Sequence, residues 1–133
     1  MRNYIVLALL SFCCLVGCSN DIGEPDSVND ISGTWAAVDD GRSNEYVIID
    51  NGRATWYMPE DDDYGVKFSN GTLYASEIKW YKDRYKCEVK NGELYLDNIY
   101  VGLVSVKNEK LYIYEDFYYE EDAEVYHRVK KIK

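Results

Sequence analysis

Four cysteines and one histidine are the side chains of this sequence that most readily do chemistry. Cys13 and Cys14 lie in the apolar N-terminal stretch, so Cys18 and Cys87 are left for the rest of the chain. Cys87 belongs to a run that alternates apolar and polar residues, which predicts a small buried apolar residue. A thiolate nucleophile needs a basic partner, and nothing in the sequence brings His127 to Cys87. We therefore expect no catalytic cysteine.

Acidic residues gather in two stretches, residues 60–63 and 115–122. Asp61 and Asp63 could supply two oxygens to Ca²⁺ on a turning loop, but no EF-hand spacing surrounds them, and such runs are usually solvated loops. A hydrolase with paired carboxylates needs acids at inward strand positions, and the predicted interior is nearly free of them. No phosphate loop or nucleophile motif is present either. We expect no metal site, no cofactor and no enzymatic activity.

The N-terminus has the pattern of an export signal. Arg2 supplies a positive charge, and residues 4–16 form an apolar stretch too short to span a bilayer as a permanent helix. The stretch ends in Leu15-Val16-Gly17-Cys18, which resembles the lipobox of bacterial lipoproteins. That resemblance implies a signal peptide over residues 1–17 and a Cys18 that carries acyl chains, two or three of which anchor a protein firmly to a membrane. The alternative is an ordinary cleaved signal.

Residues 18–30 are polar and lack periodicity, so we expect the lipidated Cys18 to be followed by a flexible tether. Ser19-Asn20-Asp21 and Glu24 partly resemble the sorting signals that send some lipoproteins to the cell surface. The expected location is the cell envelope, lipid-anchored to the outer membrane and facing the periplasm or the surface. The formal charge is −9, and it becomes −10 when Arg2 leaves with the signal. This charge opposes binding to nucleic acid.

A recurring two-residue turn organises the remainder of the chain. Asn51-Gly52, Asn70-Gly71, Asn91-Gly92 and Asn108-Glu109 each separate alternating runs, and Asn-Gly favours hairpins because both central residues of a type I′ turn need positive φ. Asp40-Gly41 has similar turn chemistry. The alternation predicts strands at residues 33–38, 45–50, 53–58, 65–69, 72–81, 85–90, 93–97, 100–107, 110–115 and 124–130.

No amphipathic helix separates these strands, so the predicted class is all-β with antiparallel pairing. An up-and-down meander that closes into a barrel of about eight strands would remove the exposed edges. A two-sheet sandwich is the rival, although it usually needs long crossovers. The run Gly33-Thr34-Trp35 resembles the Gly-x-Trp of the lipocalins. In that family the Trp packs the barrel floor beside a basic residue from the last strand, which implies floor roles for Gly33, Trp35 and Arg128 in a lipocalin-like domain over residues 31–133.

Alternation also divides the strands into two faces. The apolar face predicts the barrel interior and its candidate ligand-lining residues: Trp56, Ile78, Trp80, Tyr85, Cys87, Leu94, Leu96, Leu111 and Ile113. The opposite face predicts an exterior tyrosine stripe, formed by Tyr95, Tyr112, Tyr114 and Tyr126. His127 shares a face with Val125 and Val129, which favours a core or rim position.

These patterns favour a lipid-anchored protein that binds a small apolar ligand without transforming it, since small barrels hold one such molecule or are filled by side chains. The alternative is a protein–protein interaction module, either an envelope assembly factor or an inhibitor, that uses the exterior tyrosines. The expected partners are the membrane, a small ligand or an envelope protein, and not nucleic acid.

Overall fold

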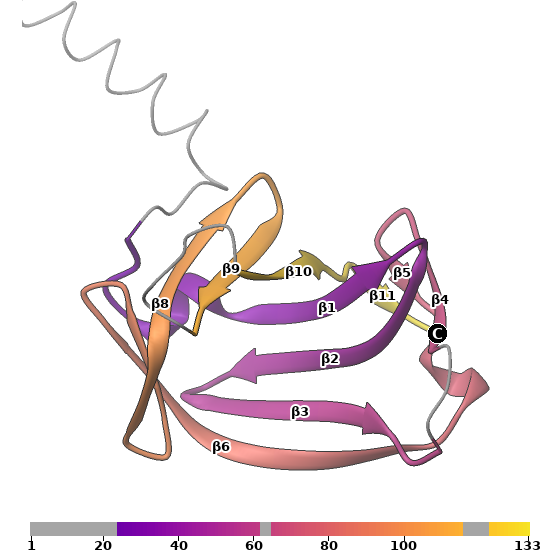
Figure 1. Cartoon of the computed structure of the whole chain (residues 1–133), viewed down its shortest axis with the longest axis horizontal. Helices are drawn as coiled ribbons and strands as arrows, with labels where there is room; N and C mark the ends of the chain where they lie inside the picture. Colours follow the sequence, from indigo (N-terminus) through magenta and orange to yellow (C-terminus); the bar gives the residue numbers. More distant parts are fainter. Residues whose placement is uncertain (1–23, 62–64, 116–122) are drawn as a thin grey trace, which may run out of the picture.

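The computed structural model describes residues 24–61, 65–115 and 123–133 (Figure 1). The predicted signal peptide, Cys18 and the tether up to residue 23 lie outside these ranges. Residues 62–64 and 116–122, which belong to the two acidic stretches, lie outside them as well. Within the described ranges, no helix has the length and apolar character needed to cross a membrane.

Eight antiparallel strands pair in a closed ring. Each strand pairs with the next one in the ring, and the last, β10, pairs back onto β1. In chain order they are β1 (Gly33–Asp39), β2 (Arg42–Asp50), β3 (Arg53–Pro59), β6 (Trp80–Lys90), β7 (Glu93–Leu96), β8 (Ile99–Lys107), β9 (Lys110–Tyr114) and β10 (Glu124–Arg128). In Figure 1, β8 and β9 cross the direction of β1, β2 and β3 at a steep angle. The predicted all-β meander, closed into a barrel-like ring of eight strands, is confirmed.

Three short strands form a flap beside the ring. They are β4 (Val66–Ser69), β5 (Thr72–Leu73) and β11 (Lys131–Ile132). The flap continues the sheet from the first residues of β2, because Arg42 pairs with Lys67 and Ser43 with Val66. β5 and β11 run parallel, whereas every other strand pair in the described ranges is antiparallel. Figure 1 shows the flap beyond the ends of β1 and β2.

The predicted strand over residues 72–81 is wrong. The chain leaves β5 after Leu73, forms the short 3-10 helix η2 (Ala75–Glu77) and begins β6 at Trp80. β6 then pairs with β3 along the whole length of β3. The segment Lys82-Asp83-Arg84 gives no sequence signal for this first half of β6, because these residues are exposed on both faces and show no apolar alternation.

Positive φ at both central residues marks each two-residue turn, as a type I′ turn requires. The four predicted turns behave in this way: φ is 55° and 76° at Asn51-Gly52, 51° and 80° at Asn70-Gly71, 50° and 77° at Asn91-Gly92, and 52° and 63° at Asn108-Glu109. Asp40-Gly41 and Asp97-Asn98 do the same. The alternation does not indicate the Asp97-Asn98 turn, because it predicts that residue 97 belongs to the preceding strand.

Two apolar cores lie on opposite faces of β2. Val47 and Ile49 point into the ring, where they join the main core with Trp35, Leu94 and other buried residues. Tyr46 and Ile48 point outward into a second core that the flap covers. The predicted strand over residues 45–50 is apolar on both faces for this reason: the sheet is buried on two sides there.

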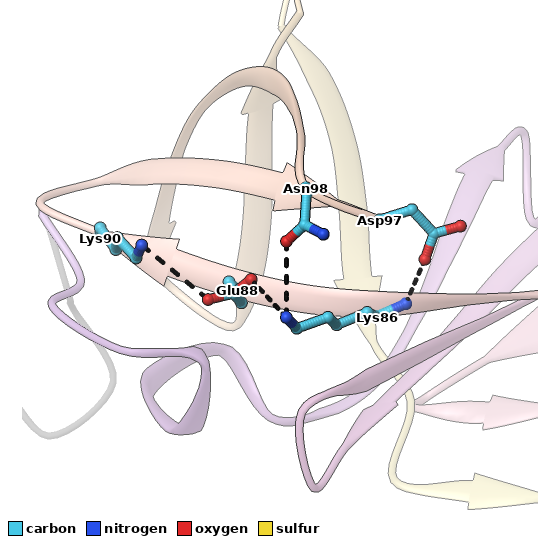
Figure 2. A network of polar contacts seen from close by, with 5 residues as sticks. All are labelled: Lys86, Glu88, Lys90, Asp97 and Asn98. Atoms are coloured by element: carbon cyan, nitrogen blue, oxygen red, sulfur yellow. Dashed lines mark hydrogen bonds and ion pairs between the residues drawn. The ribbon is translucent and has the colours of Figure 1, made fainter.

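A polar network lies on the outer face of β6. Lys86 Nζ lies 3.3 Å from Glu88 Oε1 and 3.4 Å from Asn98 Oδ1 (Figure 2). The backbone N–H of Lys86 donates to Asp97 Oδ1 at 2.7 Å. Lys90 Nζ lies 4.0 Å from Glu88 Oε2. Exposed ion pairs of this kind contribute little stability. The backbone bonds matter more, because the N–H of Asp97 also donates to the Lys86 carbonyl at 2.9 Å and ties the β7–β8 turn to β6.

Candidate functional site

The two ends of the ring differ in what they contain. In an up-and-down meander, alternate turns lie at opposite ends, so the turns Asn51-Gly52, Asn91-Gly92 and Asn108-Glu109 share one end. The 3-10 helix η1 (Val28–Ile31) packs over this end, with Ile31 in the main core. We call it the capped end. The other end carries three inward glutamates, described below, and we call it the glutamate end.

The capped end brings together the three residues of the predicted barrel floor. Trp35 is fully buried, and its indole Nε1–H donates to the carbonyl of Ile31 at 3.0 Å. The guanidinium carbon of Arg128 lies 4.1 Å from the centre of the Trp35 ring, which is a cation–π contact. Gly33 has φ of 142°, and a Cβ there would lie 2.8 Å from Arg128 Nη1. The glycine therefore makes room for the arginine to lie over the tryptophan.

Arg128 also holds the turn between β8 and β9. Its Nε lies 2.9 Å from Glu109 Oε2, and its backbone N–H donates to the Glu109 carbonyl at 2.9 Å. Glu109 has φ of 63°, a conformation that costs energy for a residue with a side chain. The ion pair and the backbone bond offset that cost, which gives a physical reason for a glutamate where the other predicted turns have glycine.

At the glutamate end, aromatic donors converge on carboxylates. Trp56 Nε1–H donates to Glu45 Oε2 at 2.6 Å. The Tyr126 hydroxyl lies 2.8 Å from the same oxygen and 2.9 Å from Glu124 Oε2. A tyrosine has one hydroxyl proton, so it donates to one carboxylate at a time. Burial, together with the charges of Glu45 and Glu124, raises the pKa of Tyr126, which keeps its hydroxyl protonated.

Glu115 completes the group from the end of β9. A hydrogen bond with Glu124 raises its pKa to about 7, with burial and the charges of Glu124 and Glu45 acting in the same direction. The expectation of an interior nearly free of acids is therefore wrong at this end of the ring. The sequence does contain a signal for this placement, because residues two apart in a strand share a face. Glu45 shares its face with Val47, Glu115 with Ile113, and Glu124 with Tyr126.

We expect the stability of the domain to fall as pH rises from about 4.5 to about 7. In that window the unfolded chain has released the Glu115 proton, whereas the folded chain still binds it. Glu115 is largely exposed, and solvent screening reduces the effect to about 1 kcal/mol.

Urea unfolding at several pH values measures this slope. The Glu115→Gln variant should flatten it, because an amide still donates to Glu124 but does not titrate. Glu60→Gln, which removes an exposed acid after β3, is the matched control and should keep the slope. Parallel curves for the wild type and Glu115→Gln would contradict the assignment.

Most of the predicted interior residues lie in or against the main core. Tyr85 is half-buried, and its ring meets the Trp56 ring edge-on, with 6.2 Å between the two ring centres. Cys87, Leu94, Leu111 and Ile113 are buried in the main core, and Trp56 and Leu96 pack against it.

Ile78 and Trp80 do not line the interior. Both pack in the second core under the flap, where Trp80 Nε1–H donates to the Ala75 carbonyl at 2.7 Å and its ring meets Tyr46 edge-on at 4.9 Å. The physical reason is parity: Trp80 shares its face of β6 with Lys82 and not with Tyr85. The predicted strand over residues 72–81 ends before Lys82 and Tyr85, so it does not show which of them shares a face with Trp80.

Tyr126 is also placed differently from its prediction. It is buried in the main core instead of belonging to the exterior stripe. Residues two apart in a strand share a face, so an inward Arg128 already required an inward Tyr126. Tyr95, Tyr112 and Tyr114 are half-buried on the outside, where Tyr95 meets Tyr100 edge-on at 5.5 Å.

The cysteine and the histidine lie on different faces of the ring. Burial and the charge of Glu88 raise the pKa of Cys87 to about 11, so its side chain stays a thiol at neutral pH. His127 is half-buried on the outer face of β10, beside Phe68 at 6.1 Å. Burial and Lys110 lower its pKa. Among the residues that the structure describes, no three His, Cys, Asp or Glu side chains are grouped to hold a metal ion.

No family model matches the chain, and searches of curated proteins and of solved structures found no match either.

Proposed function

We propose that this protein is a membrane-anchored lipoprotein whose lipocalin-like barrel binds a small, mainly apolar molecule at the glutamate end without transforming it. The contrast between the two ends carries the proposal. The capped end is filled by Trp35 and Ile31, which are fully buried. The glutamate end instead presents the partly exposed Trp56 and Tyr85 beside a few fixed polar groups.

This combination is typical of small-molecule sites, which have mostly apolar or aromatic walls and a small number of orienting polar groups. Trp56 and Tyr85 would contact the apolar body of the molecule. The Glu45 carboxylate already accepts bonds from Trp56 and Tyr126 and is held in place by them. It would face a hydrogen-bond donor on the molecule.

The same groups argue for binding and against hydrolysis. Glycosidases separate their two carboxyl groups by about 5 Å or more, so that a sugar or a water fits between them. Glu115 and Glu124 instead hydrogen-bond to each other. The Tyr126 hydroxyl, bonded to both Glu45 and Glu124, lies between those two carboxylates where the sugar or the water would have to fit. Cys87 is buried as a neutral thiol, which makes it a poor nucleophile.

The binding proposal is tested with the domain purified from its own host. Native mass spectrometry should show a retained small molecule, and the neutral dye N-phenyl-1-naphthylamine should gain fluorescence on binding. Trp56→Leu should abolish both signals. Leu103→Ser is the matched control, because Leu103 is 45 % exposed on the outer face of β8 and far from Trp56 in the ring order. Equal loss in both variants, or no signal in the wild type, would contradict the proposal.

The second candidate function is a protein–protein interaction module. The outer face of β8, β9 and β10 supports it, because Leu103 and Val125 are 45 % and 36 % exposed there. On β9, which lies between them, Tyr114 is the cross-strand partner of Leu103 and Tyr112 that of Val125. The variants above separate the two functions. Capture of one envelope protein that is lost in Leu103→Ser and kept in Trp56→Leu would favour this candidate.

A further inference from the structure

We propose that the capped end is the surface that faces the membrane, and that the domain holds its glutamate end away from the lipid. This inference rests on the lipid anchor at Cys18 in the proposed function. It goes beyond that anchor because it assigns the contacting surface of the folded domain.

The first argument is where the tether joins the fold. Pro25 is buried, and its carbonyl accepts a hydrogen bond from the N–H of Gly92 at 2.8 Å, in the β6–β7 turn of the capped end. Glu24 lies against the same turn, since a Cβ on Gly92 would be 2.9 Å from Glu24 Cγ. The Asp30 carboxylate accepts the N–H groups of Asp26 and Ser27 at 3.0 and 3.3 Å and fixes the path of the chain into η1.

The second argument is reach. Six residue steps join Cys18 to Glu24, so even a fully extended tether spans only about 20 Å. β2 has nine residues, which gives a strand of about 30 Å and, with the usual tilt, a barrel of roughly 20–25 Å between its ends. The capped end therefore stays within one tether length of the lipid, and the glutamate end lies a further barrel length away.

The test uses the full lipidated chain in vesicles of phosphatidylethanolamine and phosphatidylglycerol that contain a nitroxide-headgroup lipid. Single cysteines carry an environment-sensitive fluorophore at Asn51→Cys and Asn91→Cys, at the capped end, or at Asp40→Cys, at the glutamate end. The three positions are matched, because each is the exposed first residue of a two-residue turn, with φ of 55°, 50° and 53°. The native Cys87 is buried with a raised pKa, so it resists labelling.

We expect the nitroxide lipid to quench the labels at residues 51 and 91 strongly and the label at residue 40 weakly. Equal quenching at all three positions, or stronger quenching at residue 40, would overturn the orientation while leaving the anchor intact. Flotation of the protein with the vesicles reports on the anchor separately. If the wild-type chain fails to float, just as the Cys18→Ala variant does, the anchor and the orientation are overturned together.

Discussion

Replacing Trp35 with alanine is expected to lower the free energy of unfolding by about 3–5 kcal/mol, the usual cost of deleting a buried aromatic side chain. Trp35 is fully buried in the main core and anchors η1 through its bond to Ile31. The change also removes the ring under the Arg128 guanidinium. Denaturant unfolding of the domain measures the loss.

Trp80→Ala is a matched control for this prediction. Trp80 also donates its indole N–H to a backbone carbonyl, that of Ala75, but it is only half-buried and lies in the second core. Its truncation should cost clearly less. Trp35→Phe keeps most of the apolar area and should lose about 1 kcal/mol through the missing hydrogen bond. If Trp35→Ala left stability unchanged, the capped end would not be a structural element of this barrel.

Adding one methyl group at Gly102 is expected to destabilise the domain by about 3 kcal/mol, the upper range for overpacking a well-packed site. A Cβ at Gly102 would lie 2.1 Å from the Tyr114 carbonyl oxygen and 2.8 Å from its carbon. These are backbone atoms of the neighbouring strand, which cannot rotate away as a side chain can. β8 and β9 would have to separate next to the pairing of Leu103 with Tyr114.

Gly52→Ala provides the control for this prediction. Gly52 has φ of 76°, so alanine there is strained, but a Cβ would meet no atom within 4 Å. The expected loss is about 1 kcal/mol, the cost of a left-handed conformation. Thermal unfolding of both variants compares the two effects. Equal losses would mean that the close approach of β8 to β9 has no energetic consequence.

The inward glutamates show where reading the alternation was incomplete. The alternation predicts a strand that begins at Glu45 and has Val47 and Ile49 on one face, and the same parity puts Glu45 on that face. The sequence instead favours solvated loops for the acids, because charged runs are usually solvated. Hydrogen bonds from Trp56 and Tyr126, together with the open position at a barrel end, make the inward placement tolerable.

Trp80 and Ile78 show a different limit of local sequence patterns. The alternation predicts that both are buried, but it does not predict in which of the two cores they lie. A second core exists because the flap from β4, β5 and β11 folds over the outside of β1 and β2, and β11 comes from the far end of the chain. Pairing between residues 72–73 and 131–132 is a contact of long sequence separation. Local alternation says which residues are apolar and cannot say which of two cores receives them.

The sequence by itself determined most of the two-residue turns, the antiparallel pairing of neighbours and most of the strand ranges of this protein. These features depend on local physics: positive φ at Asn-Gly pairs and the two-residue period of a pleated strand. Only the tertiary structure decided how β10 closes onto β1, which side of the ring the flap covers and where Glu45, Glu115 and Glu124 meet. Those features depend on contacts between residues far apart in the chain, and a reading of local patterns does not determine them.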